Sequence, residues 1–245
     1  MGEMKARKLA IDTRLRLGSQ TTEYFDVYRA VLSLGITCIK RPLESKISGA
    51  TIRGNRAQII LVNSLKSLGH QNFTIAHEIY HCIYDDGLQS RVCNTENFGK
   101  GTGDEELADL FAVHLLMPEE AIIYQLTLRR KLEEKLSLTD IINLEQYFGV
   151  SRRAMLWRLE ELNLISSQES DQYATNIKKR AKLRGKDISL YEATKDNIVI
   201  SDYAEKAEEA LDKGLITESR YEEILTDAGL FEKVLSEIEE ADIVD

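Results

Sequence analysis

Two histidines four residues apart, with a glutamate directly after the first, are the residues of this sequence best placed to do chemistry. They stand in the segment His77-Glu78-Ile79-Tyr80-His81. Four residues advance an α-helix by about 400°, so the two imidazoles share a face one turn apart and could bind one metal ion. Glu78 lies about 100° round from His77 and could act as a general base on a water at the metal. The spacing therefore predicts a divalent metal site on a helix.

A second group of acidic residues follows 24 residues after His81. Glu105 and Asp109 are again four apart and share a helix face, whereas Glu106 lies about 100° off that face. A carboxylate can serve as a zinc ligand, and an acid one turn later can accept the free N–H of a ligand histidine. We therefore expect Glu105 to be the third ligand and Asp109 to orient a histidine.

Five further side chains near these motifs could act on a metal or a substrate. Tyr84 returns to the face of the two histidines, where its phenol could stabilise the oxyanion of a tetrahedral intermediate; the alternative is a core or rim tyrosine. His114 is expected to face away from the metal, and His70 to serve in a turn or cap, although it could reach a substrate. Cys82 is expected to be a small buried hydrophobe. Cys93 could swing onto the metal in a resting state, an interpretation that we do not favour.

The elements that must position these residues follow from hydrophobic periodicity and turn residues. The apolar spacing of residues 21–34 predicts a helix. Three apolar runs separated by turn residues predict strands at residues 36–39, 47–52 and 58–62. The helices that carry the two motifs are expected over residues 73–84 and 105–117. Between them, residues 85–104 have four glycines and no periodicity, so we expect a long functional or mobile loop.

The C-terminal half is expected to be helical. Residues 137–166 predict two short helices around a turn, similar to a helix-turn-helix, with Ser151 as the N-cap of the second. This segment carries three basic and four acidic side chains, whereas a helix that reads DNA usually has a basic face, so we favour a packing or protein-docking module. The basic run 178–186 is either a solvated face or a patch that pairs with the acidic, amphipathic segment 201–245.

Composition bounds the class of protein and its compartment. Hydrophobic residues make up 43% and charged residues 30% of the 245, as in ordinary globular proteins. Residues 201–245 carry a net charge of −11 and the other 200 residues +2, which argues against a general nucleic-acid binder. Three cysteines, no secretory signal and no apolar run of membrane-spanning length favour the cytoplasm. We expect three segments, at residues 1–130, 131–166 and 167–245.

Taken together, the two motifs resemble the ImmA/IrrE family of metallopeptidases, compact relatives of the thermolysin-like gluzincins. The resemblance runs through Phe73-Thr74-Ile75-Ala76-His77-Glu78-Ile79-Tyr80-His81 and Glu105-x-x-Ala108-Asp109-x-Phe111-Ala112-x-x-Leu115-Leu116-Met117-Pro118, within residues 20–166. It implies His77, His81 and Glu105 as the ligands of one zinc ion per chain, with another divalent metal possible, and Glu78 as the catalytic base.

The same resemblance implies an α+β fold. We expect a small antiparallel or mixed three-stranded sheet packed on the two motif helices, followed by a helical C-terminal half. Tyr80 stands where many family members have glycine, and Asp109 where many have asparagine. Neither departure changes an expected ligand.

The resemblance further implies a regulatory protease. The best-understood members of the family act inside bacteria and cleave a helix-turn-helix repressor, so the expected activity is a zinc-dependent endopeptidase with a repressor-type DNA-binding protein as its substrate. The alternative is a catalytically silent regulator or toxin–antitoxin component that binds a repressor or DNA, although direct DNA binding is disfavoured. We expect selective cleavage of one partner that docks on residues 137–245 and extends along the strand edge near residues 47–52.

Overall fold

A computed structural model of the chain describes residues 2–54, 57–85, 90–93, 103–129, 131 and 134–227. The elements are, in order, α1 (Gly2–Arg16), α2 (Val27–Ser33), β1 (Ile36–Arg41), β2 (Gly49–Arg53), β3 (Gln58–Asn63), α3 (Leu68–Tyr84), β4 (Ser90–Cys93), α4 (Asp104–Leu116), α5 (Glu119–Leu128), α6 (Leu138–Phe148), α7 (Arg152–Glu161), α8 (Ser167–Tyr173), α9 (Ile177–Lys182), η2 (Ser189–Tyr191), β5 (Ile198–Ile200), α10 (Tyr203–Asp212) and α11 (Glu218–Asp227). The chain divides into two compact units, Met1–Ile200 and Ser201–Asp245. The α+β class is as expected.

One mixed sheet of five strands lies in the first unit, in the order β4-β2-β3-β1-β5. The pair β1–β3 is parallel, and the other three pairs are antiparallel. The expectation of three strands was therefore wrong. The two extra strands, β4 and β5, have only four and three residues and lie at the sheet edges. Such short edge strands are defined by the neighbour with which they pair, so their own sequence gives little periodicity to detect.

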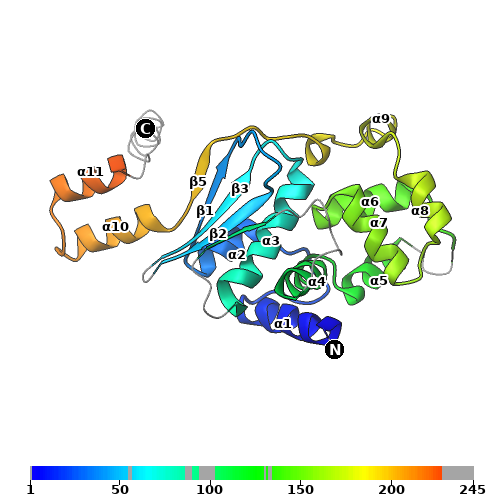
Figure 1. Cartoon of the computed structure of the whole chain (residues 1–245), viewed down its shortest axis with the longest axis horizontal. Helices are drawn as coiled ribbons and strands as arrows, with labels where there is room; N and C mark the ends of the chain where they lie inside the picture. Colours follow the sequence, from blue (N-terminus) through cyan, green and yellow to red (C-terminus); the bar gives the residue numbers. More distant parts are fainter. Residues whose placement is uncertain are drawn as a thin grey trace. The chain divides into compact units, whose positions relative to one another are not determined.

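The helices cover the sheet and one another in a compact arrangement around α3. This helix packs on β2 and β3, α2 packs on β1 and α3, and α4 packs against both α1 and α3 (Figure 1). The expected helix at residues 21–34 begins only at Val27, because the Asp26 side chain accepts hydrogen bonds from the backbone N–H groups of Tyr28 and Arg29 and caps it there. The helix that carries the histidine motif begins earlier than expected, at Leu68.

Two helices with a short connection, α6 and α7, follow the metal-motif helices. A reciprocal pair of hydrogen bonds between Ser137 and Asp140 begins α6, and Gly149, with φ at 64°, ends it in the left-handed conformation that glycine adopts without strain. Ser151 accepts from the backbone N–H of Ala154, which confirms it as the N-cap of α7. A likeness to a helix-turn-helix stays a prediction. One hydrophobic core runs from α1 to the end of this helix pair.

The last segment of the first unit returns to the sheet. Its strand β5 pairs with β1, and Asp196 forms an ion pair of 2.8 Å with the buried Lys40 of β1. The segments that we expected at residues 1–130, 131–166 and 167–245 stay predictions, but a deletion of the third would remove β5 from the sheet. Among the described helices, none has both the length and the apolar character needed to cross a membrane.

Candidate metal centre

The centre forms where α3 passes close to β2. Nearly every residue of α3 from Gly69 to Cys82 is buried, the half-exposed His70 being the exception, so its polar side chains are enclosed by protein. A Cβ on Gly49 of β2 would lie 2.5 Å from the Thr74 side chain and 3.0 Å from Oε1 of Glu78. Only glycine permits this approach, which brings the backbone of β2 beside the glutamate of the histidine motif.

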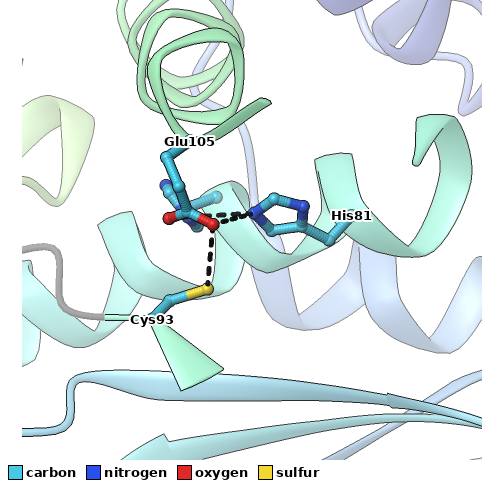
Figure 2. Close-up of side chains that lie close together, drawn as sticks. His81, Cys93 and Glu105 are labelled. Carbon is cyan, nitrogen blue, oxygen red and sulfur yellow. Dashed lines mark hydrogen bonds and ion pairs between the residues drawn. The ribbon is translucent and has the colours of Figure 1, made fainter. Parts of the chain in front are cut away.

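The three expected ligands converge on one point. The Nε2 atoms of His77 and His81 are 3.2 Å apart; Oε2 of Glu105 lies 3.4 Å from the first, and Oε1 of Glu105 lies 3.5 Å from the second. Figure 2 shows the Glu105 carboxylate, projecting from α4, facing the His81 ring of α3. Both histidines are buried, whereas the Glu105 side chain is 35% exposed, so solvent reaches the cluster from the side of Glu105.

A carboxylate orients each histidine from behind. Nδ1 of His77 lies 2.9 Å from Oδ1 of Asp109, and Nδ1 of His81 lies 3.0 Å from Oδ2 of Asp85. An Nδ1–H that donates to a carboxylate leaves the Nε2 lone pair free, which is the tautomer that a metal needs. The structure thus supplies an orienting acid to both histidines, of which the sequence indicated only Asp109.

The distances and the charges of this cluster fit a divalent metal ion. Ligand atoms at 2.0–2.2 Å from a tetrahedral zinc ion lie about 3.3–3.6 Å from one another, close to the three separations between His77, His81 and Glu105. Among the residues that the structure describes, carboxylates outnumber cations around the point of convergence. The carboxylates belong to Glu78, Glu105, Asp85 and Asp109, and Arg91 is a cation that contacts two of them.

Glu78 is positioned as a buried carboxylate beside the cluster. The Thr51 hydroxyl of β2 donates to its Oε2 at 2.7 Å, and its Oε1 has no hydrogen-bond partner among the described residues. Burial raises the pKa of Glu78, against the opposing effects of His77 and of the bond from Thr51. The pKa of Glu105 is instead lowered to about 2, chiefly by its hydrogen bond to His77, with Arg91 contributing. One acid thus favours proton uptake while the other stays ionised as a ligand requires.

Comparison with known proteins agrees with this geometry. Residues 32–160, more than half of the chain, match the model of the peptidase M78 family, described as the IrrE N-terminal-like domain. The chain belongs to this family. The match covers β1, β2, β3, α3 and α4, so it includes every element of the cluster, and it supports a metallopeptidase type of function. The search of the curated proteins found no match.

The other candidates in this M78 chain lie elsewhere or have different contacts. Tyr84 was expected as a stabiliser of the transition state, but its hydroxyl lies 2.9 Å from Thr13 Oγ1 and 3.3 Å from the carbonyl oxygen of Leu9, both on α1. It shares the angular position of His77 but lies about 10 Å further along the helix axis, where α1 covers it. The described contacts of its hydroxyl are thus with α1, and the role in the transition state stays a prediction. His114 is buried beside Arg158, away from the cluster.

Asp85 and Arg91 contact the centre from outside the expected set, and Cys93, which we considered as a metal ligand but did not favour, lies beside it. Arg91 of β4 forms ion pairs with Glu105 at 2.8 Å and with Asp85 at 3.4 Å. Cys93 of the same strand has its sulfur 3.9 Å from Glu105 Oε1 (Figure 2). Asp85 stands four residues after His81, the same spacing as in the other pairs, and this signal could have found it. Arg91 carries no such signal, because it lies in an aperiodic segment.

Proposed function

We propose that the chain is a zinc-dependent endopeptidase whose ligands are His77, His81 and Glu105. The observation that carries this proposal is the convergence of two imidazole nitrogens and the Glu105 carboxylate at separations of 3.2–3.5 Å, each histidine being oriented by its own carboxylate. A bound zinc ion would supply Lewis-acid polarisation of a scissile carbonyl and of a water.

The residues of the chain would then hold and move the proton. Glu78, buried and with one carboxylate oxygen that has no hydrogen-bond partner in the described part of the chain, accepts the proton of the attacking water and returns it to the leaving amine. Thr51 fixes the other oxygen through its 2.7 Å hydrogen bond and so orients the carboxylate. Burial raises the pKa of Glu78 and with it the affinity for this proton.

Metal content and one isosteric variant test the proposal. We expect about one zinc per chain by elemental analysis, and its loss in His81→Ala. Glu78→Gln should keep the zinc and lose on the order of 10²–10⁴ in peptide hydrolysis, because the amide can accept from Thr51 but cannot take a proton. Glu106→Gln makes the same chemical change at an exposed position of α4 and is the matched control.

The contrary results are equally definite. Zinc retained at full stoichiometry by His81→Ala would refute the ligand set. Hydrolysis by Glu78→Gln at the rate of Glu106→Gln would refute the role of the base. Zinc binding without hydrolysis in any variant would favour the catalytically silent regulator.

We further propose that the substrate is a cytoplasmic repressor-type DNA-binding protein, and that the chain does not itself bind DNA. The two most buried arginines of α7 support this view: Arg152 pairs with Glu145, and Arg158 pairs with Glu161 and donates to the carbonyl oxygen of Met117. These cations are engaged inside the protein and do not form a basic face for the phosphate backbone. The three unpaired cysteines are in keeping with a reducing compartment.

Co-expression with a candidate repressor tests the partner. We expect one defined fragment with the wild type and none with Glu78→Gln, and slow digestion of casein by both. Efficient casein digestion by the wild type would indicate a general peptidase instead. Salt-sensitive binding of the protein to DNA fragments would show direct DNA recognition.

A further inference from the structure

The strand β4 brings a cysteine into the donor set of the metal centre. The Cys93 side chain is buried, and its sulfur lies 3.9 Å from Oε1 of Glu105 (Figure 2). Ligand atoms of His77, His81, Cys93 and Glu105 all lie within 4.8 Å of one another. We propose that Cys93 is a fourth ligand of the metal and that β4 closes the site with the protein's own chain. This inference rests on the proposed zinc site.

The strand geometry aims the sulfur at the site. Successive side chains of a strand alternate between its two faces, so Arg91 and Cys93 share one face while Val92 points the other way. Both of the first two contact Glu105, whereas Val92 is 64% exposed. The pairing of the strand thus places the thiol on the face that is turned toward the cluster.

The separations fit a zinc–sulfur bond. With Zn–S near 2.3 Å and Zn–O near 2.1 Å, a tetrahedral ion places sulfur and oxygen about 3.6 Å apart. The observed separation between Cys93 and Glu105 is 3.9 Å, about 0.3 Å more than this tetrahedral value. Two imidazoles, one carboxylate and one thiolate would fill all four positions, whereas catalytic zinc sites keep one position for water.

The position of β4 in the sheet also blocks the edge of β2 beside the metal centre. Gly49 of β2 pairs with Cys93, and this glycine is the residue that lies against Glu78. We expected a substrate to extend along this edge of β2, but β4 pairs with four of its five residues, from Ile52 opposite Ser90 to Gly49 opposite Cys93. A peptide that adds to β2 beside Glu78 must therefore first displace β4.

The strand can be displaced without unfolding the core. It has four residues, lies at the sheet edge, and only Cys93 within it is buried. Its departure would remove the sulfur from the metal and free the edge of β2 in one movement. The geometry thus describes a latent peptidase whose closed state is held by a metal–thiolate bond and an edge strand.

Cobalt substitution of the full chain tests this ligand directly. Co²⁺ takes the same tetrahedral donor sets as zinc, and a thiolate bound to it gives a charge-transfer band in the near ultraviolet. We expect this band in the wild type and in Cys38→Ala, the matched control at a buried cysteine of β1, and its loss in Cys93→Ser. Peptide hydrolysis by the zinc form of Cys93→Ser should exceed that of the wild type.

A second measurement needs no variant. In the wild-type protein, zinc should slow the alkylation of Cys93 by iodoacetamide by about tenfold or more relative to EDTA-treated protein, since a metal-bound thiolate is no longer a free nucleophile. Mass spectrometry of the alkylated peptides identifies the site, with Cys38 as the internal standard.

The outcomes separate this inference from the proposed function. Stoichiometric cobalt without a thiolate band, or alkylation of Cys93 that zinc does not change, would overturn the inference and leave the three-ligand site standing. Absence of bound metal in the wild type would overturn both.

Discussion

The hydrogen bond between His77 and Asp109 offers a quantitative test of the metal centre. Its length is 2.9 Å, and the side chains of His77 and Asp109 are 2% and 8% exposed, so water does not compete for it. Carboxylates that orient a ligand histidine typically contribute 10–100-fold to metal affinity, which corresponds to about 1.4–2.7 kcal/mol. Asp109→Ala removes both the acceptor and its charge, so we expect the zinc Kd to rise toward the upper end of this range.

Two further variants divide that effect into its parts. Asp109→Asn keeps an oxygen acceptor and removes the charge, so its loss should be about tenfold. Asp85→Ala acts on His81 in the same way, but Asp85 also faces Arg91 at 3.4 Å, which already offsets part of its charge. We therefore expect a smaller loss for Asp85→Ala than for Asp109→Ala.

Competition titration against a zinc chelator measures these constants, with thermal melting as the check on the fold. Glu106→Ala is the control, because it removes a carboxylate from the exposed face of the same first turn of α4. A zinc Kd for Asp109→Ala within about threefold of the wild type, well below the range for such carboxylates, would refute the orienting role of Asp109.

Three more predictions concern the remainder of the chain. Burial, with Arg158 adding to it, lowers the pKa of His114 to about 4, so between pH 6.5 and 4 the unfolded chain binds a proton that the folded chain does not. The free energy of unfolding should therefore decrease by at most about 3 kcal/mol as the pH falls from 6.5 to 4, and denaturant titrations of His114→Phe should show a flatter pH dependence. Arg152→Met should cost about 3–5 kcal/mol in urea unfolding because Glu145 is left buried without its cation, and a second change, Glu145→Leu, should restore most of it; an additive loss would contradict this. A chain ending at Ile200 should keep its melting temperature and zinc affinity while partner cleavage falls, and unchanged cleavage would remove residues 201–245 from the docking surface.

The local sequence predicted most of the residues of the candidate centre. The positions of His77, Glu78 and His81 relative to one another depend only on the helical period, and the same holds for Glu105 and Asp109. The presence of two such motifs in one chain indicated that Glu105 lies near the two histidines, and the structure brings the three side chains together. Three strands and the N-cap of α7 were likewise readable, because alternation, turn residues and capping act within a few residues.

Only the tertiary structure decided what surrounds that centre. Tyr84 has the angular position of a ligand on α3, yet α1 covers it. The helical period predicts the face on which a residue lies, but it does not predict which neighbouring element packs against that residue. The strand β4 places Arg91 and Cys93 at the metal centre through its pairing with β2, and β5 joins the sheet from a segment well over one hundred residues away from its partner β1. Short edge strands acquire their structure from their partners, so the sequence determined the metal-binding motifs and the fold determined what closes over them.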